Sequence, residues 1–506
     1  MKINYNGEYL RNLRIQKGVK QKEVADILGI SRQMLSYYEN GIKTPSIQKA
    51  KELANYYNVS FLSILYGDEA IENDKEDKLN SNCEFNNIIL KNKIVLGTRN
   101  NQKILISKNI IKNILNINFE TNCCYDNFSK NQIIDSIRNN ENIVVYTSNK
   151  ALYNNSYYEL KENNYNVKIF NLSNPLKSDS WNLLDDLYTL SNNSETIKEF
   201  LNIFDKNKES NNLIKKAKLH LFNSLCDYVY WNYDIIKTVA YEYKRDFAII
   251  RYILKENDIK KLNSIMEKEP IYKYSKEQWD LFYKYTDEIK EIAYLELLSD
   301  FEIFDNLEIK NITRTNDFSC KDIIKEKVAI FIISPLVNSY YNELANALVN
   351  VLINWTIFYK TSIKENNKTQ INFIFDKILK DSNILNLNTI EKLNSCDSKI
   401  YLNLNTLISL KKFLDEFEFV EFLDKFNLKF INNNINKRDI EILDISKISL
   451  NNEKILIKLN KDEFILNRYN ENFKDNKYDI DSYIPEWKKR LNEINFRFGS
   501  EFMKEI

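Results

Sequence analysis

The stretch QKEVADILGISRQMLSYYENG, residues 21–41, decides the fold of the first part of this chain. Its apolar residues recur at the three- and four-residue spacing of a helix, first over 21–28 and again over 32–40. Gly29 supplies a tight turn between the two runs, and the hydroxyl of Ser31 is placed to cap the second one. The stretch therefore predicts two short helices joined by a turn.

The second of these helices has a polar outer face. If Leu35 and Tyr38 point to the core, helical spacing turns a defined set of side chains outward. These are Arg32, Gln33, Ser36 and Tyr37, with Met34 at the edge. Arg grips guanine with two donors, Gln grips adenine, and Met contacts a thymine methyl group. We therefore expect this helix to lie in a DNA groove, with Arg32 and Gln33 reading bases.

Residues 6–67 resemble the Cro/CI-type, or XRE-family, helix-turn-helix domain. The segments GEYLRNLRIQKG, SIQKAKELANYYN and VSFLSILYG would supply the three remaining helices of an all-α, five-helix unit. The resemblance implies a structural ion pair between Arg14 and Glu39. It also implies further DNA contacts, to the phosphates, from Gln21, Asn40 and Lys43.

Charge is distributed unevenly along the chain. Residues 1–67 hold ten Lys and Arg against five Asp and Glu, whereas the whole chain of 506 residues carries a net charge of only +1. A local cationic surplus suits a polyanionic partner such as double-stranded DNA. No apolar run approaches the roughly 18 to 20 residues needed to cross a bilayer, and no signal peptide is evident, so we expect a cytoplasmic protein without membrane insertion.

Metal and thiol chemistry find little support in the composition. The six cysteines are scattered except for the adjacent pair Cys123 and Cys124, and His220 is the sole histidine. This pattern lacks the paired spacing of a zinc site, so we predict no metal and no cofactor. We interpret His220 as a packing or surface residue.

The rest of the chain divides by its patterns. A charged stretch over 68–82 predicts a linker after the domain at 1–67. Short apolar runs of strand character alternate with amphipathic helices beyond it, which is typical of a parallel sheet covered by helices. These runs are NIVVYTS, VKIFNLS, VAIFIIS, INFIFD and SKIYLNL. Long helical patterns replace them over 191–321, which predicts a helical insertion between two parts of an α/β domain, 83–190 and 322–506.

Residues 85–480 resemble the type IV coupling proteins, the TraG-like ATPases of conjugative DNA transfer. The landmarks are a strand ending in Phe-Asn-Leu that is followed by Ser-Asp-Ser-Trp-Asn at 178–182, the helical insertion, and the segments that begin at Lys327 and Ile371. The resemblance implies an α/β fold of the RecA-like, P-loop NTPase type. It also implies a ring assembly and conjugation-machinery partners.

The residues that hydrolyse ATP in that family are largely missing here. A phosphate-binding loop needs glycines, yet five of the seven glycines lie within residues 1–67. At the expected place the chain reads YDNFSKN, in which Lys130 survives alone. Asp376 keeps the place of the magnesium carboxylate, but Lys377 replaces its acidic neighbour. The Gln expected on the next strand is replaced by Asn403 or Asn405. The pattern predicts a pseudo-ATPase with no catalytic residue and only remnants of a nucleotide site at Lys130 and Asp376.

We therefore predict a sequence-specific DNA-binding protein, a transcriptional regulator associated with a mobile or conjugative element. Its large domain would bind a partner or self-associate, and paired half-sites would require a homodimer or higher homo-oligomer. Two alternatives stay open. One is a DNA-stimulated ATPase or DNA-transfer motor with an atypical nucleotide site. The other is a DNA-bound scaffold for a transfer or partition machine.

Overall fold

The structure is a computed structural model, and it describes most of the chain between residues 7 and 490. The described residues are 7–57, 59, 64, 93–99, 102–111, 113–117, 127–189, 194–207, 209–231, 245–268, 273–325, 327–335, 340–362, 370–376, 387–396, 398–404, 421–426, 428–431, 454–459, 462–467 and 478–490. The chain forms two compact units, one of Met1–Asn127 with Phe426–Glu471 and one of Phe128–Lys425 with Asn472–Ile506. The predicted linker at 68–82 lies outside the described residues.

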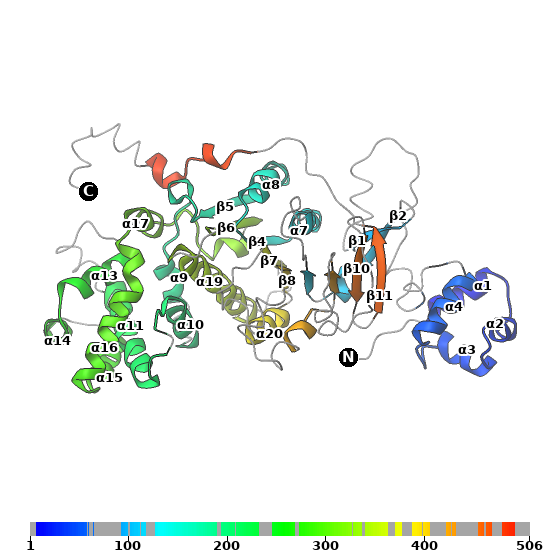
Figure 1. The fold of residues 1–506 in the computed structure, drawn as a ribbon, viewed down its shortest axis with the longest axis horizontal. Coiled ribbons are helices and arrows are strands. Elements are labelled where there is room, and N and C mark those ends of the chain that lie inside the picture. The colour runs from blue at the N-terminus through cyan, green and yellow to red at the C-terminus, as the bar shows by residue number, and fades with distance from the viewer. Residues whose placement is uncertain are drawn as a thin grey trace. The chain divides into compact units, whose positions relative to one another are not determined.

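The first unit begins with four helices (Figure 1), which are α1 Gly7–Gln16, α2 Gln21–Ile27, α3 Arg32–Glu39 and α4 Ile47–Tyr57. Gly29 and Gly41 have φ values of 61° and 70°, the left-handed conformation that closes helices α2 and α3 at little cost. The helices enclose one core of Leu10, Val24, Ala25, Leu28, Leu35, Tyr38, Ala50, Leu53, Ala54, Tyr57 and Ile64. The predicted fifth helix lies mostly outside the described residues.

Strands complete the described part of the first unit. They are β1 Lys93–Arg99, β2 Gln102–Ser107, β3 Ile114–Ile117, β9 Leu428–Ile431, β10 Lys454–Leu459 and β11 Asp462–Asn467. Their order is β2-β1-β11-β10-β9-β3, with every neighbouring pair antiparallel except β3 and β9. A 3-10 turn, η1 Lys108–Ile110, separates β2 from β3. None of these strands was predicted from the sequence, because their runs are short and are interrupted by Lys and Asn.

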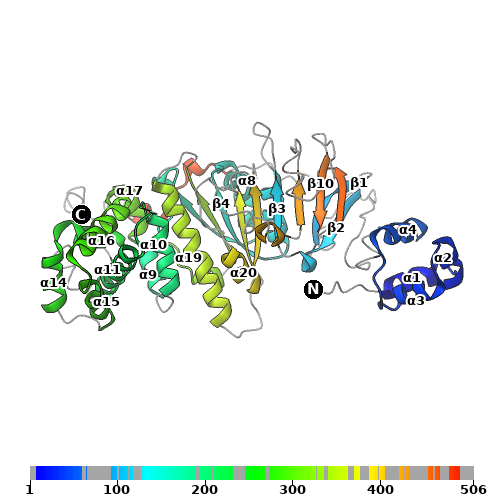
Figure 2. The ribbon, with the colours of Figure 1, turned by 60° about the horizontal axis from the view of Figure 1, so that its bottom comes forward.

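Among its described residues, the second unit has five parallel strands in the order β8-β7-β4-β6-β5, all of which Figure 1 labels. Figure 2 shows the same sheet turned by 60°, with β4 labelled. They are β4 Asn142–Thr147, β5 Asn166–Asn171, β6 Val328–Ile333, β7 Ile371–Asp376 and β8 Lys399–Leu404. Every residue of β4, β6 and β7 is buried, as expected for strands covered on both faces. The five runs predicted as strands are thus the five strands, and the predicted α/β class is confirmed.

Helices cover both faces of this sheet. Right-handed crossovers in opposite directions, from β4 to β5 and from β6 to β7, require their helices to lie on opposite faces. Figure 1 accordingly shows α7 and α8 on one face and α19 and α20 on the other. Their bounds are α7 Asn127–Arg138, α8 Lys150–Glu162, α18 Asp322–Lys325, α19 Tyr340–Ser362 and α20 Leu387–Ser395.

The insertion predicted over 191–321 has helices and 3-10 turns, and no strand, among its described residues. The helical segment begins earlier than predicted, at Leu183. It comprises α9 Leu183–Thr189, α10 Ser194–Phe204, α11 Asn212–Trp231, α13 Phe247–Glu256, α14 Ile259–Lys268, α15 Lys273–Tyr283, α16 Asp287–Asp300, the 3-10 turn η3 Phe301–Asp305 and α17 Leu307–Thr313. Stacked phenylalanines, among them Phe200, Phe222 and Phe247, form its core. Buried Lys218 contacts Asp205 and Asp300 and ties α11 to the ends of its neighbours. Among the described helices, none is long and apolar enough to cross a membrane.

Candidate nucleic-acid interface and sheet-edge site

Helix α3 is held by its apolar side and leaves its polar side accessible. Ser31 Oγ accepts a hydrogen bond from the backbone N–H of Met34 at 3.1 Å and caps the helix, as predicted. Leu35 and Tyr38 are buried in the core. The predicted base readers Arg32 and Gln33 are exposed, as are Asn40 and Lys43, whereas Met34, Ser36 and Tyr37 are half-buried.

Hydrogen bonds connect the polar side chains along this face. Gln33 Nε2 donates to the Tyr37 hydroxyl at 2.9 Å, and Asn40 Nδ2 donates to Ser36 Oγ at 3.2 Å. Each pair is four residues apart and therefore shares one side of the helix. Lys43 Nζ lies 5.8 Å from the centre of the Tyr37 ring. The face thus presents fixed donors and acceptors beside one another.

The buried carboxylate of Glu39 connects α3 to α1 and α2 behind the outward face of α3. Glu39 is 3% exposed, and its Oε1 and Oε2 accept hydrogen bonds from Arg14 Nε at 2.7 Å and Nη2 at 3.0 Å. These hydrogen bonds to Glu39 raise the pKa of Arg14. Gln21 Nε2 also donates to Glu39 Oε2, at 2.9 Å. The ion pair implied by the resemblance is formed, and Gln21, which we expect to contact a phosphate, is directed at Glu39 in this DNA-free structure.

In the second unit, three elements converge on the carboxylate of Asp376. It lies at the end of β7 and is 3% exposed. Its Oδ1 accepts hydrogen bonds from Ser129 Oγ of α7 at 2.8 Å and from Asn403 Nδ2 of β8 at 3.0 Å. Its Oδ2 accepts one from Thr147 Oγ1 of β4 at 2.8 Å. Hydroxyl and amide donors thus occupy both oxygens at the carboxyl edge of the sheet.

Lys130 lies next to this cluster, in the first turn of α7. It is half-buried, and burial lowers its pKa. Ser129 was not singled out from the sequence, although its hydroxyl directly precedes the surviving Lys130. Of the two Asn candidates on β8, Asn403 reaches Asp376, while Asn405 and Lys377 lie outside the described residues.

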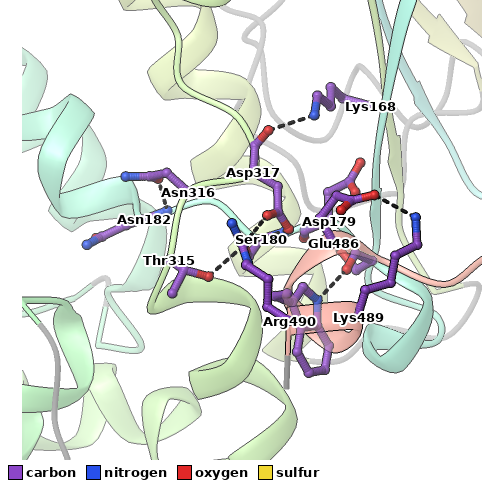
Figure 3. Close-up of polar contacts among 12 residues, drawn as sticks. Lys168, Asp179, Ser180, Asn182, Thr315, Asn316, Asp317, Glu486, Lys489 and Arg490 are labelled. Atoms are coloured by element: carbon purple, nitrogen blue, oxygen red, sulfur yellow. Dashed lines mark hydrogen bonds and ion pairs between the residues drawn. The ribbon is translucent and has the colours of Figure 1, made fainter. Parts of the chain in front are cut away.

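Residues 178–182, the Ser-Asp-Ser-Trp-Asn landmark, form the neck where the helical insertion leaves the sheet (Figure 3). Ser180 donates through both N and Oγ to Asp317 Oδ2, at 3.1 and 2.9 Å. The backbone N–H of Asn182 donates to Asn316 Oδ1 at 2.7 Å. Because 178–182 precede helices α9 to α17 and 315–317 follow them, these hydrogen bonds hold the two ends of the helical segment together.

The C-terminal segment 478–490 packs on the neck. Trp487 Nε1 donates to the Ser178 carbonyl at 2.8 Å, the Tyr483 hydroxyl donates to Asp179, and Arg490 pairs with Asp317. Figure 3 shows Arg490 reaching toward the neck. Burial raises the pKa of Asp179 to about 6, although hydrogen bonds from Tyr483 and the backbone of Ile169 act against this.

Thiol and histidine chemistry find no site in the described part of the chain. Cys226, Cys320 and Cys396 are buried thiols, and burial raises the pKa of Cys226 and Cys320. His220 Nδ1 lies 2.8 Å from Gln278 Oε1 in the insertion. Within the described residues, no group of three or more His, Cys, Asp and Glu side chains has metal-binding geometry.

Comparison with known families accounts for both regions. Residues 10–64 match the helix-turn-helix family, and residues 133–380 match the type IV secretory system conjugative DNA transfer family. Residues 10–64 are thus similar to helix-turn-helix domains of the XRE type, and residues 133–380 are similar to conjugative DNA transfer domains. We call the first the HTH domain, and we call the second unit the coupling-type domain. Both family predictions from the sequence are confirmed.

Curated relatives share the HTH domain. The HTH-type transcriptional regulator ImmR of Bacillus subtilis is 36% identical over 74 residues, which are 15% of this chain and 58% of ImmR. Antitoxin PezA of Streptococcus pneumoniae is 37% identical over 71 residues, which are 14% of this chain and 44% of PezA. The chain therefore spans about half the length of the curated relatives it matches.

Solved structures share the fold of the larger part. The unbound bacterial conjugative coupling protein TrwB, lacking its first 70 residues, aligns with a TM-score of 0.51 over 78% of this chain and 93% of its own, at 10% identity. TrwB in complex with a non-hydrolysable GTP analogue aligns with a TM-score of 0.51 over 81% of this chain and 98% of its own, at 9% identity. These likenesses confirm the RecA-like fold.

Proposed function

We propose that this protein is a sequence-specific DNA-binding regulator of a mobile or conjugative element, and that its coupling-type domain binds a partner or self-associates without hydrolysing nucleotide. The outward face of α3 carries the first half of the proposal. Arg32 and Gln33 are exposed on a helix whose opposite side is fixed in the core, so both are available to base edges in the major groove. The relative ImmR is itself a transcriptional regulator.

The surroundings of Asp376 support the second half. A magnesium ion at this carboxylate would need oxygen positions that Ser129, Thr147 and Asn403 already occupy with hydrogen bonds. The sequence around Lys130 lacks the glycines that let backbone N–H groups wrap a phosphate. We infer that the cluster stabilises the sheet edge in place of a nucleotide.

Nucleotide binding and turnover on the full chain test the second half. We expect neither ATP binding at millimolar concentration nor turnover above background, with or without DNA. Asp376→Asn and Lys130→Ala should leave DNA binding unchanged, as should the control Asp280→Asn on an exposed helix of the insertion. Turnover that Lys130→Ala abolishes would replace this half of the proposal.

A DNA-stimulated ATPase is the second candidate. It is favoured by the arrangement of Ser129, Lys130 and Asp376, because a hydroxyl and a lysine at the start of a helix lie beside a carboxylate at a strand end. DNA-dependent phosphate release from the purified wild-type chain, lost in Asp376→Asn, would identify this activity.

Assembly on DNA follows from the size of one HTH domain. A single recognition helix reads a short half-site, so useful specificity requires two domains on paired half-sites. We expect at least a homodimer on DNA, with half-sites about 10 base pairs apart or a multiple of this. Mass measurement of the complex, with one half-site and then two, distinguishes a dimer from independent monomers.

A further inference from the structure

A groove lies between helices α10 and α11 of the helical insertion, both of which Figure 2 labels. Its volume is about 380 Å³, far more than one ordered water occupies. The lining residues recur every three or four positions, over 198–205 at α10 and over 212–219 on α11, so each helix contributes a single side. Rows of side chains on two neighbouring helices form the kind of groove into which a third helix packs.

Lysines and leucines line this groove together. Lys198 of α10 and Lys216 of α11 are exposed, and neither forms an ion pair among the described residues. Lys215, next to Lys216, is half-buried. Buried Leu201 and half-buried Leu219 supply apolar surface to the same groove. The groove therefore suits an occupant that carries carboxylates beside an apolar side chain.

The carboxylates near the groove converge on buried Lys218. Asp205, the acidic residue of the lining, lies 2.7 Å from the ammonium group of Lys218 and 3.9 Å from that of Lys215. Asp300 and Glu296 of α16 approach the same Lys218, at 2.8 and 3.4 Å. Burial raises the pKa of Asp300, although the charge of Lys218 opposes this. The two exposed lysines take no part in this cluster, so their charges are available to a partner.

Helix α16 of the same insertion presents a complementary surface. Glu288, Glu291 and Leu295 lie three to seven residues apart and so share one side of the helix. Both glutamates are exposed and form no ion pair among the described residues, and Leu295 is 54% exposed. Asp287, at the start of the helix, contacts Lys290 at 2.8 Å instead. The outward side of α16 thus combines two carboxylates with an apolar side chain.

We propose that the groove is an interface between copies of this chain, in which α16 of a second copy lies between α10 and α11. Leu295 of the second copy covers the leucines of the groove, and its Glu288 and Glu291 meet Lys198 and Lys216. The lengths agree, because the three outward residues of α16 and each side of the groove span seven residues, about 10 Å of helix. One contact thereby accounts for the exposed leucine and for the exposed lysines.

The contact joins two different patches of each copy. Helix α16 packs on α11 through its buried side, whereas the groove lies where α11 faces α10. Such an interface is heterologous, so each copy can bind one neighbour through its groove and another through α16. One helix in a groove buries less than the roughly 1,200 Å² of a stable complex, so the association is weak and depends on concentration. The proposal rests on the proposed function, because it names a surface for self-association of the coupling-type domain.

Sedimentation velocity of the full chain without DNA, over a concentration series, tests the contact. The wild type should sediment faster as its concentration rises, and high salt should reduce this effect by screening the exposed charges. Lys198→Glu with Lys216→Glu places like charges opposite the glutamates of α16. Glu288→Lys with Glu291→Lys does the same opposite the lysines of the groove. We expect each double variant to associate at least about tenfold more weakly than the wild type.

Exchange of charges separates this contact from misfolding. A mixture of the two double variants restores opposite charges across the interface and should associate as the wild type does. A single chain with all four changes should behave in the same way. The control Lys273→Glu with Lys276→Glu, on α15, should leave association unchanged. Association that neither double variant weakens, or that the mixture does not restore, would overturn the interface.

Operator binding by the same proteins keeps this proposal distinct from the proposed function. A wild type that stays monomeric at every concentration would overturn both the interface and self-association, while intact operator binding would leave DNA recognition standing. Association that all the variants retain would overturn the interface alone, because another surface would then carry self-association.

Discussion

Two buried carboxylates, Glu39 in the HTH domain and Asp376 in the coupling-type domain, are stabilised in different ways. Both are 3% exposed and both accept three hydrogen bonds from side chains. Arg14 supplies two of the three bonds to Glu39, so the charge there is compensated by a cation. The donors to Asp376 are two hydroxyls and an amide, which stabilise a negative charge without neutralising it.

The difference bears on what each region can do. In the HTH domain the Arg14–Glu39 ion pair joins helices α1 and α3 on the inner side of α3. The outward face of α3 therefore stays accessible to DNA. In the coupling-type domain the hydrogen bonds of Asp376 lie at the carboxyl edge of the sheet, where α/β proteins bind ligands. We infer that Glu39 supports the DNA-binding face of α3, whereas the hydrogen bonds of Asp376 close a former nucleotide site. The predictions below test that contrast, beginning with the largest effect.

Removing the reading side chains should cost the most. Arg32→Ala combined with Gln33→Ala would remove the two bidentate base contacts that we propose, each worth about 1–3 kcal/mol. We expect affinity for a selected operator to fall roughly a thousandfold, while binding to unrelated duplex DNA keeps most of its salt dependence. Fluorescence anisotropy on operator and scrambled duplexes measures both, with Arg11→Ala on the exposed side of α1 as the control. Specific binding that survived the double change would place the reading face elsewhere.

Neutralising Glu39 should lower the free energy of unfolding more than neutralising Asp376 does. Glu39→Gln leaves Arg14 without its counter-ion, and we expect a loss of about 3 kcal/mol in the HTH domain. Asp376→Asn keeps most of its hydrogen bonds and should cost about 1 kcal/mol. Hydrogen exchange of α1–α4 and of β7 amides reads the two regions separately. The exposed pair Lys49–Glu52 supplies the control, because Glu52→Gln should cost well under 1 kcal/mol. Equal losses at Glu39 and Asp376 would remove the contrast.

Sequence patterns predicted the parts of this protein that carry strong periodicity. Helices α2 and α3 end one residue before the predicted limits of 28 and 40. The five predicted strand runs are β4 to β8, because parallel strands covered by helices are largely apolar and stand out in the sequence. The strands β1 to β3 and β9 to β11 were not predicted, since short runs interrupted by Lys and Asn resemble the Lys- and Asn-rich background of this chain.

The candidate sites were predicted less completely than the fold. The outward face of α3 follows from helical spacing alone, and so it could be predicted residue by residue. The donors to Asp376 come from three elements that are far apart in sequence, and Ser129 is separated from Asp376 by 247 residues. Spacing cannot identify such partners, because only the pairing of β4, β7 and β8 and the packing of α7 on the sheet bring them together. The docking of Trp487 on Ser178 was unpredictable for the same reason.

A third buried carboxylate, Asp179, should make the stability of the protein depend on pH. Its pKa of about 6 in the folded protein lies above the value of about 3.9 of an unfolded chain, so the folded state binds the proton more tightly. Its stabilising contribution is full below about pH 4 and is lost as pH rises through 6, a change on the order of 2 kcal/mol. Asp179→Asn should abolish that difference between pH 4.5 and 7.5 in urea unfolding. Unchanged pH dependence would mean that solvent reaches Asp179 beside Tyr483.

The smallest effect concerns how Gln33 is oriented. Its Nε2 donates to the Tyr37 hydroxyl, which fixes the amide with its carbonyl oxygen directed away from Tyr37. A fixed amide discriminates adenine better than a rotating one, because the oxygen and the second N–H meet the base in one arrangement. Tyr37→Phe removes this bond and should relax preference at a single base position about threefold to fivefold, near 1 kcal/mol.

Selection from randomised duplexes, comparing wild type with Tyr37→Phe, measures this preference position by position. Ser36→Ala is the matched control on the same face, because Ser36 hydrogen-bonds Asn40 rather than Gln33. A uniform loss across all positions would show that Tyr37 contacts the phosphate backbone, and the HTH face would then be less preorganised than its hydrogen bonds indicate.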